Sequence, residues 1–226
     1  MLADIDTWVL DLDDTLYPSS NGLANQMKAL IRGILSRHFG TDDAGARRIQ
    51  AELIAAHGTT LRGLMTTEGL AAADILEFEH HIDYSVLRAD AVLAEAIAAL
   101  PGRKFVFTNG SAYHAEQALA RLGLSDHFDG VFDILAGQLI PKPYPESYRR
   151  FVEQFSIDPS RAAFFDDLAV NLDVPEQLGM ATVWVGGEPA PGTAPYEVVA
   201  PRRWRVWELA PFLHSLTAPA VRPSTM

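Results

Sequence analysis

Short apolar runs alternate with helical patterns along much of the chain. The runs with the length and composition of buried strands are Thr7–Leu12, Lys104–Phe107, Ala162–Phe165 and Ala181–Val185. Helical patterns separate them; one spans Ser111–Leu122, and Gly123 is suited to end it. Strands that alternate with helices are typical of a parallel sheet covered by helices on both faces. The pattern therefore predicts an α/β fold.

The strand pattern is interrupted between Pro18 and about Arg88. Apolar residues recur there at helical spacing, namely Leu23, Met27, Leu30, Ile31, Ile34, Leu35, Ile49, Leu53 and Ile54. A stretch of about 70 residues is much longer than the usual connection in a compact α/β unit, which favours a separate module over one more helical layer. We therefore predict a helical cap at 18–88, inserted into an α/β core formed by 1–17 and 89–216.

The composition indicates a globular protein that uses oxygen and nitrogen chemistry. Of the 226 residues 48% are hydrophobic, which suffices for one core and a smaller module. The absence of cysteine excludes disulfides, thiolate nucleophiles and cysteine-based zinc sites. We find no apolar segment of membrane-spanning length and no signal-peptide pattern, so we expect a cytoplasmic protein. Residues 217–226 are small, polar and include proline, which predicts a disordered tail.

The formal net charge of −11 limits the classes of partner. Nucleic-acid polymers and anionic membranes bind to clustered Lys and Arg, so we expect neither as a partner. The one basic cluster, Arg202, Arg203 and Arg205, is interrupted by Trp204, and we interpret it as a solvated edge. An anionic substrate would require local neutralisation by a bound cation and a few placed basic groups. The oligomeric state is not visible in the sequence.

Acidic residues follow two of the predicted strands. Asp11 and Asp13 come at the end of the first, and Asp166 and Asp167 at the end of the third. Ligands of open parallel sheets bind beyond the carboxyl ends of the strands, so we expect these carboxylates to converge. Converging carboxylates take up protons or a cation, and Mg²⁺ prefers such oxygen ligands, so we predict a magnesium site with Asp11 and Asp166 as ligands. Asp14 and Asp167 are equally compatible with a role as helix N-caps.

Candidate phosphate-binding groups follow the second strand and lie in a proline-rich segment. Thr108, Asn109 and Gly110 come at the start of a helix, where a hydroxyl and backbone N–H groups suit phosphoryl oxygens. These residues are also compatible with helix capping alone. Lys142 is one of only three lysines and lies between two prolines just before a helix. The rigid flanks favour a positioned charge over a flexible surface lysine.

Taken in order, these motifs are similar to a known family. The residues concerned are Asp11, Asp13 and Thr15 of a D-x-D-x-T motif, Thr108-Asn109, Lys142 and Asp166-Asp167. Up to about Val185 the chain resembles the haloacid dehalogenase-like hydrolase superfamily. The stretches that resemble its pyrimidine 5′-nucleotidase branch are DLDDTLYP, TLRGLM at Thr60–Met65, HIDY at His81–Tyr84, FTNGSAYHAEQALARLG and FFDDLAVNL.

The resemblance implies a Rossmann-like core with a cap and a phosphoaspartate mechanism. Asp11 attacks phosphorus, and Asp13 acts as general acid on the leaving oxygen and then as general base on water. Mg²⁺ is bound by the carboxylates of Asp11 and Asp166 and by the backbone carbonyl of Asp13. Lys142 neutralises the phosphate and Asp11. Residues expected to support these groups are Thr15, Asp167 and Asn171.

We therefore predict a Mg²⁺-dependent phosphomonoesterase that acts on a small phosphorylated metabolite. The branch resemblance implies a pyrimidine nucleoside 5′-monophosphate, such as UMP or CMP. Another phosphomonoester, such as phosphoglycolate or a sugar phosphate, is the alternative. Two positions depart from the pattern of the branch, because Asp14 stands where Asn is frequent and Leu168 where Ser is frequent.

Other activities of the same superfamily match the residues less well. A dehalogenase would not need Asp13. A phosphonate hydrolase would need a Schiff-base lysine in the cap, where the only lysine, Lys28, lies off the apolar stripe and is expected to face solvent. A phosphomutase shares the core groups and stays open as an alternative. A catalytically silent binding protein would tolerate loss of an acidic or basic site group, and all of them are present.

The residues that recognise the leaving group are harder to locate. Candidates are Tyr17, His38, Thr59, Thr60, Arg62 and Ser111, each of which also has an ordinary packing or capping explanation. His114 lies one helical turn past Asn109, and we expect it to be a solvated helix residue.

Overall fold

The computed structural model describes residues 2, 4–189 and 192–217. The tail predicted at 217–226 falls outside these residues, except for Thr217, which ends the last helix. Within the described ranges, no helix combines the length and hydrophobicity needed to cross a membrane.

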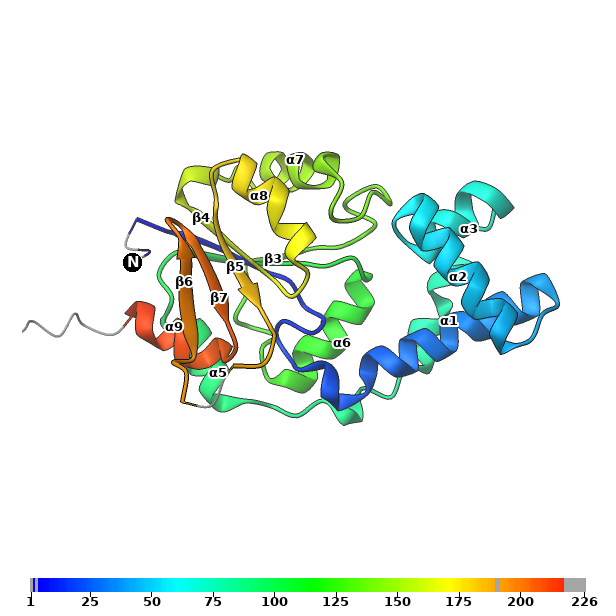
Figure 1. The fold of residues 1–226 in the computed structure, drawn as a ribbon, viewed down its shortest axis with the longest axis horizontal. Coiled ribbons are helices and arrows are strands. Elements are labelled where there is room, and N and C mark those ends of the chain that lie inside the picture. Colours follow the sequence, from blue (N-terminus) through cyan, green and yellow to red (C-terminus); the bar gives the residue numbers. More distant parts are fainter. Residues whose placement is uncertain (1, 3, 190–191, 218–226) are drawn as a thin grey trace, which may run out of the picture.

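Seven strands in the described part of the chain form one sheet in the order β3-β2-β1-β4-β5-β7-β6 (Figure 1). They are β1 Thr7–Leu10, β2 Arg103–Phe107, β3 Gly130–Phe132, β4 Ala162–Asp166, β5 Ala181–Val185, β6 Tyr196–Ala200 and β7 Arg203–Val206. All neighbouring strands are parallel except β6 and β7, which are antiparallel. The predicted α/β fold is confirmed, and the four predicted strands correspond to β1, β2, β4 and β5.

Helices cover both faces of this sheet (Figure 1). They are α5 Ala91–Ala99, α6 Ala112–Leu122, α7 Pro145–Gln154, α8 Asp173–Gln177 and α9 Leu209–Thr217. Because successive side chains of a strand point to opposite faces, Leu10 of β1 packs in the cluster formed with α5, α6 and α9, whereas Val9 packs with α7. β1 is therefore buried on both sides, which explains why its sequence is a continuous apolar run.

The register of the central strands aligns their carboxyl ends. Leu10 of β1 pairs with Val106 of β2 and with Phe165 of β4. The N–H group of Asp11 donates a hydrogen bond of 2.9 Å to the Phe165 carbonyl, which extends the ladder by one residue. Asp11 and Asp166 therefore leave the sheet side by side.

A second group of helices lies beside the sheet, between β1 and α5, and we call it the cap (Figure 1). Its helices are α1 Leu23–Phe39, α2 Asp43–His57, α3 Thr60–Glu68 and α4 Ala72–Leu76. They enclose a small apolar cluster of their own, built from Leu35, Ala46, Leu53, Leu64 and Ile75. Lys28 on α1 is exposed, as expected from its place off the apolar stripe.

The segment that returns from the cap to α5 packs against the core. It contains two short 3₁₀ turns, Glu77–His81 and Tyr84–Val86. Ile82 and Tyr84 are buried in the same cluster as α5 and α6, although they fall within the range 18–88 predicted for the cap. This return segment brings polar side chains to the edge of the sheet where Asp11 lies.

The basic cluster at Arg202, Arg203 and Arg205 is partly exposed; the side chains of Arg202 and Arg203 are 37% and 40% exposed. Arg203 and Arg205 lie on β7, where they alternate with residues that are buried. The guanidinium of Arg205 stacks over Trp184, 4.3 Å from the ring centre. The alternation of Arg203 and Arg205 with the buried Trp204 and Val206 is that of a strand with one buried and one solvated face, which agrees with the expected solvated edge.

Candidate active site

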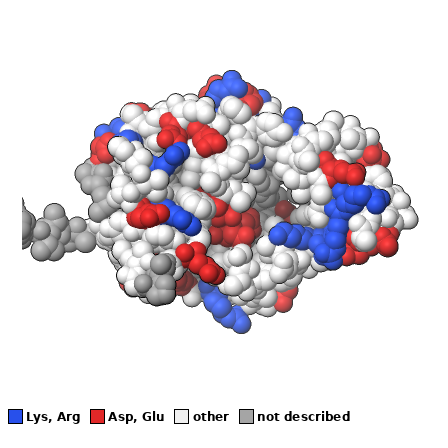
Figure 2. All heavy atoms as spheres, viewed as in Figure 1, with Lys and Arg blue, Asp and Glu red and all other residues white. Residues whose placement is uncertain are grey.

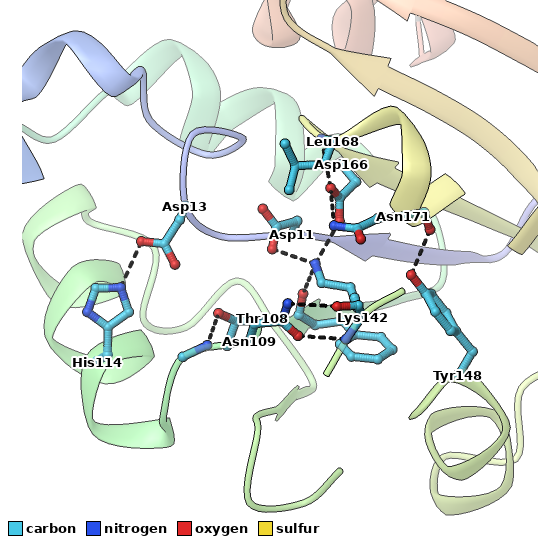
Figure 3. Close-up of polar contacts among 12 residues, drawn as sticks. Asp11, Asp13, Thr108, Asn109, His114, Lys142, Tyr148, Asp166, Leu168 and Asn171 are labelled. Atoms are coloured by element: carbon cyan, nitrogen blue, oxygen red, sulfur yellow. Dashed lines mark hydrogen bonds and ion pairs between the residues drawn. The ribbon is translucent and has the colours of Figure 1, made fainter. Parts of the chain in front are cut away.

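A buried lysine joins the acidic ends of two strands. The Nζ atom of Lys142 lies 2.6 Å from Oδ1 of Asp11 and 2.7 Å from Oδ2 of Asp166, and it donates a third hydrogen bond of 2.9 Å to the Phe107 carbonyl (Figure 3). Lys142 is only 3% exposed, and Asp166 is fully buried. The pKa of Lys142 is raised: burial opposes the charge, but the two carboxylates favour it more strongly. Lys142 is therefore a fixed cation.

Asn109 holds the backbone that carries this lysine. Its Oδ1 accepts a hydrogen bond of 2.8 Å from the Lys142 N–H, and its Nδ2 donates one of 3.2 Å to the Lys142 carbonyl (Figure 3). Both polar atoms of the side chain are thus engaged. Asn109, expected at the phosphate, acts in the structure on the position of Lys142.

Thr108 and Gly110 form a tight turn at the end of β2. The N–H of Gly110 donates to Oγ1 of Thr108 at 2.9 Å (Figure 3), and Thr108 is almost fully buried. Because Oγ1 already accepts from this N–H, its own hydrogen is free to be donated to an incoming oxygen. Thr108 thus offers a hydroxyl hydrogen for a phosphoryl oxygen, whereas both polar side-chain atoms of Asn109 are engaged with Lys142.

Three carboxyl groups crowd the carboxyl ends of β1 and β4. Asp11, Asp166 and Asp167 each offer an oxygen atom, and these atoms all lie within 4.8 Å of one another. Burial raises the pKa of Asp11 well above its usual range; Lys142 opposes this shift, and Asp166 adds to it. Burial and the neighbouring Asp166 raise the pKa of Asp167 to about 6. The positive charge of one lysine does not balance the negative charge that three carboxylates can carry. A bound divalent cation with oxygen ligands would balance it.

Asp166 is oriented by neighbours from the following turn. Its Oδ1 accepts from Asn171 Nδ2 at 2.8 Å and from the Leu168 backbone N–H at 2.9 Å (Figure 3). The hydroxyl of Tyr148 on α7 donates to the Asn171 carbonyl at 2.7 Å and fixes that turn. Since position 168 contributes its backbone N–H, the Leu found in place of Ser leaves this contact intact. The Leu168 side chain itself is 53% exposed.

The loop after β1 bends sharply behind Asp11. Asp14 adopts the left-handed region with φ of 60°, a conformation that Asn and Asp tolerate better than most residues. Oδ1 of Asp14 and Oγ1 of Thr15 are buried, and the described residues offer neither a hydrogen-bond partner. The alternative of helix capping does not hold for Asp14 or Asp167, because neither is the N-cap of a described helix.

Asp13 points away from the carboxyl cluster and toward α6 (Figure 3). Its Oδ1 lies 2.9 Å from Nε2 of His114 and also accepts from the hydroxyl of Tyr17. Burial raises the pKa of Asp13, but the charge and hydrogen bond of His114 outweigh it, and the net pKa is lowered. The same pairing raises the pKa of His114 against the effect of its burial. Asp11 and Asp13 are thus held in different surroundings, one by a lysine and one by a histidine.

His114 is 1% exposed, so the expectation of a solvated helix residue was wrong. Ser111 is the N-cap of α6 and accepts from the His114 N–H at 3.2 Å, which places His114 in the first turn of the helix. Its side chain shares the buried stripe of α6 with Ala118 and Leu122. That spacing of four residues was the signal in the sequence that could have found it.

Two residues of the return segment also reach this region, and sequence reasoning missed both. The hydroxyl of Tyr84 lies 2.9 Å from Nδ1 of His114. The carboxylate of Glu79 is buried and accepts a hydrogen bond from the hydroxyl of Ser111. Ser111, a candidate for leaving-group recognition, is therefore used as a helix cap and as a partner of Glu79.

Of the other candidates for leaving-group recognition, Tyr17 follows β1 and donates to Asp13, and the remaining ones lie on the cap. His38 pairs with Glu68 at 3.3 Å. Thr59 is the N-cap of α3 and accepts from the N–H of Arg62 at 3.1 Å, and Thr60 is buried. The structure gives these three side chains structural partners or packing and does not bring them to the carboxyl cluster.

Arg62 stands out among the candidates because it meets the core. Its guanidinium lies over the ring of Tyr144, 4.9 Å from the centre, and Tyr144 follows Lys142 by two residues. Figure 2 shows acidic side chains on the floor of the hollow between the core and the cap. The cap and core thus face each other across a hollow with an acidic floor.

Comparison with known proteins gives a family match over most of the chain. Residues 5–179 match the model of a family described as haloacid dehalogenase-like hydrolase. A curated relative, "Phosphate metabolism protein 8" of Saccharomyces cerevisiae, is 27% identical over 76% of this chain and 59% of its own length. "Enolase-phosphatase E1" of Frankia alni is 40% identical over 38% of each chain. The chain therefore spans well under two thirds of the length of both relatives.

Solved structures agree on the fold. The "HAD phosphatase from Thermococcus onnurineus" superposes with a TM-score of 0.61 at 19% identity, over 96% of this chain and all of the other. At this level of identity the likeness concerns the arrangement of strands and helices. The match extends over 96% of this chain, so it includes helices between β1 and α5 as well as the sheet.

Proposed function

The chain belongs to the haloacid dehalogenase-like hydrolase family, and we propose that it is a Mg²⁺-dependent phosphomonoesterase with Asp11 as nucleophile. The observation that carries the proposal is that the carboxyl groups of Asp11 and Asp13 have different hydrogen-bond partners. Asp11 lies against the fixed cation Lys142, and Asp13, two residues later, is bonded to His114. One carboxylate is thus placed to attack and the other to carry a proton.

The residues present suit a divalent cation. Asp11, Asp166 and Asp167 offer oxygen atoms within 4.8 Å of one another, and only Lys142 opposes their charge. Carboxylates of Asp11 and Asp166 would hold the ion, with the backbone carbonyl of Asp13 as a further ligand. When bound, Mg²⁺ supplies positive charge for the phosphoryl oxygens.

The protein groups divide the reaction into two displacements. In the first, a carboxylate oxygen of Asp11 forms a bond to phosphorus, the ester P–O bond breaks, and Asp13 gives its proton to the leaving oxygen. In the second, Asp13 takes a proton from water, the water oxygen bonds to phosphorus, and the acyl-phosphate bond to Asp11 breaks. Lys142 neutralises Asp11 and the phosphate, and the Thr108 hydroxyl donates to a phosphoryl oxygen.

For the substrate, we propose a pyrimidine nucleoside 5′-monophosphate. The support comes from the stretches that resemble the corresponding branch, above all those around Asp11, Thr108 and Asp166. The name of the Frankia alni relative specifies a phosphatase, which favours phosphoryl chemistry over dehalogenation. Another small phosphomonoester, such as phosphoglycolate or a sugar phosphate, is the alternative substrate.

The test is phosphate release in the presence of Mg²⁺ from UMP, CMP, AMP, phosphoglycolate and hexose phosphates. We expect UMP and CMP to give the highest kcat/KM, and Asp11→Asn or EDTA to abolish turnover. Asp126→Asn, the same change at an exposed position, is the matched control and should retain full activity. If another phosphate leads, the nucleotide substrate is wrong. If no phosphate is released, a binding protein on the same scaffold is the better reading.

A further inference from the structure

His114 is a buried side chain to which the proposed reaction has so far given no role. Resting on the proposed function, we propose that His114 is a positioning residue that fixes the carboxyl group of Asp13 for proton transfer to the leaving oxygen, and that Tyr84 fixes His114 in turn. The proposal concerns geometry: the direction in which the Asp13 carboxyl group faces.

Both ring nitrogens of His114 are engaged. Nε2 lies 2.9 Å from Oδ1 of Asp13, and Nδ1 lies 2.9 Å from the hydroxyl of Tyr84. The carboxylate of Asp13 only accepts, so it requires a hydrogen on Nε2, and the Tyr84 hydroxyl, which can accept from or donate to Nδ1, holds the other side of the ring. The side chain is 1% exposed, and it has no freedom to serve as a surface group.

The hydrogen bonds on Asp13 distinguish its two oxygens. Nε2 of His114 and the hydroxyl of Tyr17 both approach Oδ1. With Oδ1 occupied in this way, Oδ2 is the oxygen left to exchange a proton with the leaving oxygen and with water. Loss of His114 would leave the Tyr17 hydroxyl as the one recorded contact of Oδ1 among the described residues, so that the direction of the carboxyl group is less well fixed.

Three segments that are distant in sequence build this arrangement. Asp13 follows β1, His114 lies in the first turn of α6, and Tyr84 lies on the return segment from the cap. Glu79 on the same segment is buried against Ser111, the N-cap of α6, and so ties the segment to the helix that carries His114. The carboxyl group of Asp13 is thereby supported both by α6 of the core and by the segment that returns from the cap.

The leaving group provides the test. An alkyl phosphate such as UMP needs a proton on its leaving oxygen, whereas 4-nitrophenyl phosphate releases a stabilised phenolate that does not. For His114→Phe we expect kcat with UMP to fall by about 100-fold and kcat with 4-nitrophenyl phosphate to fall by less than about 3-fold. Asp13→Asn should show the same selectivity more strongly. A purely structural defect would lower both rates together.

Two further variants keep the test decisive. His114→Gln retains an amide N–H for Asp13 and should recover most of the UMP rate. Tyr84→Phe keeps the ring but removes the hydroxyl, and should lower the UMP rate selectively by about 10-fold. Tyr84→Phe decides the matter if His114→Phe does not fold. His127→Phe, in the loop that follows α6, is the control for the exchange of His for Phe and should change neither rate.

The outcomes separate the inference from the function on which it rests. If the wild-type protein hydrolyses neither ester, the proposed phosphatase function fails and the role of His114 fails with it. If the wild-type protein is active but the variants at His114 and Tyr84 lose both rates equally, the positioning role is overturned and the phosphatase function stands.

Discussion

The ammonium group of Lys142 lies 2.6 Å from Oδ1 of Asp11 in a site from which solvent is almost excluded. The same ammonium is shared with Asp166 at 2.7 Å. A cation shared by two buried carboxylates does two things: it lowers the repulsion between them, and it opposes the rise in the pKa of Asp11 that burial causes. Lys142 is therefore expected to be required for the reaction.

Lys142→Met should lower kcat by about 100-fold or more at saturating substrate, because a fixed positive group next to the reacting oxygens is lost. Lys142→Arg should not restore the rate, since the planar guanidinium does not fit a site built around one ammonium with three oxygen partners. Steady-state kinetics with the substrate that leads the panel measures both. Lys104→Met, at a half-buried lysine of β2 whose Nζ donates to the Gly102 carbonyl at the surface, is the matched control. Full activity of Lys142→Met would contradict the proposed mechanism.

Asn109 provides a prediction about the support of that lysine. Asn109→Ala removes two hydrogen bonds to the Lys142 backbone, of 2.8 and 3.2 Å. Each leaves a partly buried backbone group unpaired, so we expect the free energy of unfolding to fall by about 1–3 kcal/mol. The rate should fall by about 10-fold as Lys142 loses its fixed position.

Urea denaturation and steady-state kinetics measure the two effects of Asn109→Ala. Asn25→Ala, at an exposed position of α1, makes the same chemical change but removes no hydrogen bond to Lys142. It should alter neither the free energy of unfolding nor the rate. An Asn109→Ala variant with normal stability and reduced activity would instead indicate that Asn109 contacts the substrate.

Much of the fold is visible in the sequence because buried strands have a simple pattern. β1, β2, β4 and β5 lie in the middle of the sheet or next to it, and their apolar runs locate them within about two residues. β3 has only Gly130–Phe132, too short to form a pattern. β6 exposes most of its residues, and β7 alternates Arg with buried residues, so both lack the continuous apolar run used to find strands.

The residues of the candidate site likewise fall into two groups: those that the sequence locates and those that it does not. The aspartates after β1 and β4 are found from the sequence because strand order alone brings their positions together. The contact of His114 with Asp13 joins residues 101 positions apart and depends on the rotation of α6 about its axis. Tyr84 and Glu79 depend on how the return segment packs against α6. Rotation and packing of this kind follow from side chains of several elements at once, and no single stretch of sequence determines them.

Metal binding gives the next prediction. Asn171 holds Oδ1 of Asp166 through a hydrogen bond of 2.8 Å, so that Oδ2 faces Lys142. Partners of this kind usually alter metal affinity by 10–100-fold when they are removed, and we expect Asn171→Ala to weaken Mg²⁺ binding by about 10-fold or more. Titration of Mg²⁺ by calorimetry measures this in the absence of substrate, with Asn25→Ala as the control. Unchanged Mg²⁺ affinity would place the ion away from Asp166.

The final prediction concerns stability and pH at Glu79. Burial raises the pKa of this carboxyl group above its ordinary value of 4.5, although hydrogen bonds from Ser111 oppose the shift. A raised pKa means that the folded protein binds the proton more tightly than the unfolded chain between pH 4.5 and the raised value. In that window the contribution of Glu79 to stability therefore declines as the pH rises, and above it the folded state bears the full cost of a buried charge. Glu79→Gln should remove this decline.

We therefore expect Glu79→Gln to unfold at a higher urea concentration than the wild type at pH 8, and the difference to shrink toward pH 4.5. Urea midpoints over this range measure the effect, and Glu95→Gln, at an exposed position of α5, should show no such pH-dependent difference. A Glu79→Gln variant that is less stable than the wild type at pH 8 would mean that the ionised carboxylate is favourable where it lies. Its hydrogen bonds with Ser111 and its attraction to His114 would then outweigh burial, and Glu79 would belong with Tyr84 among the groups that hold His114 in place.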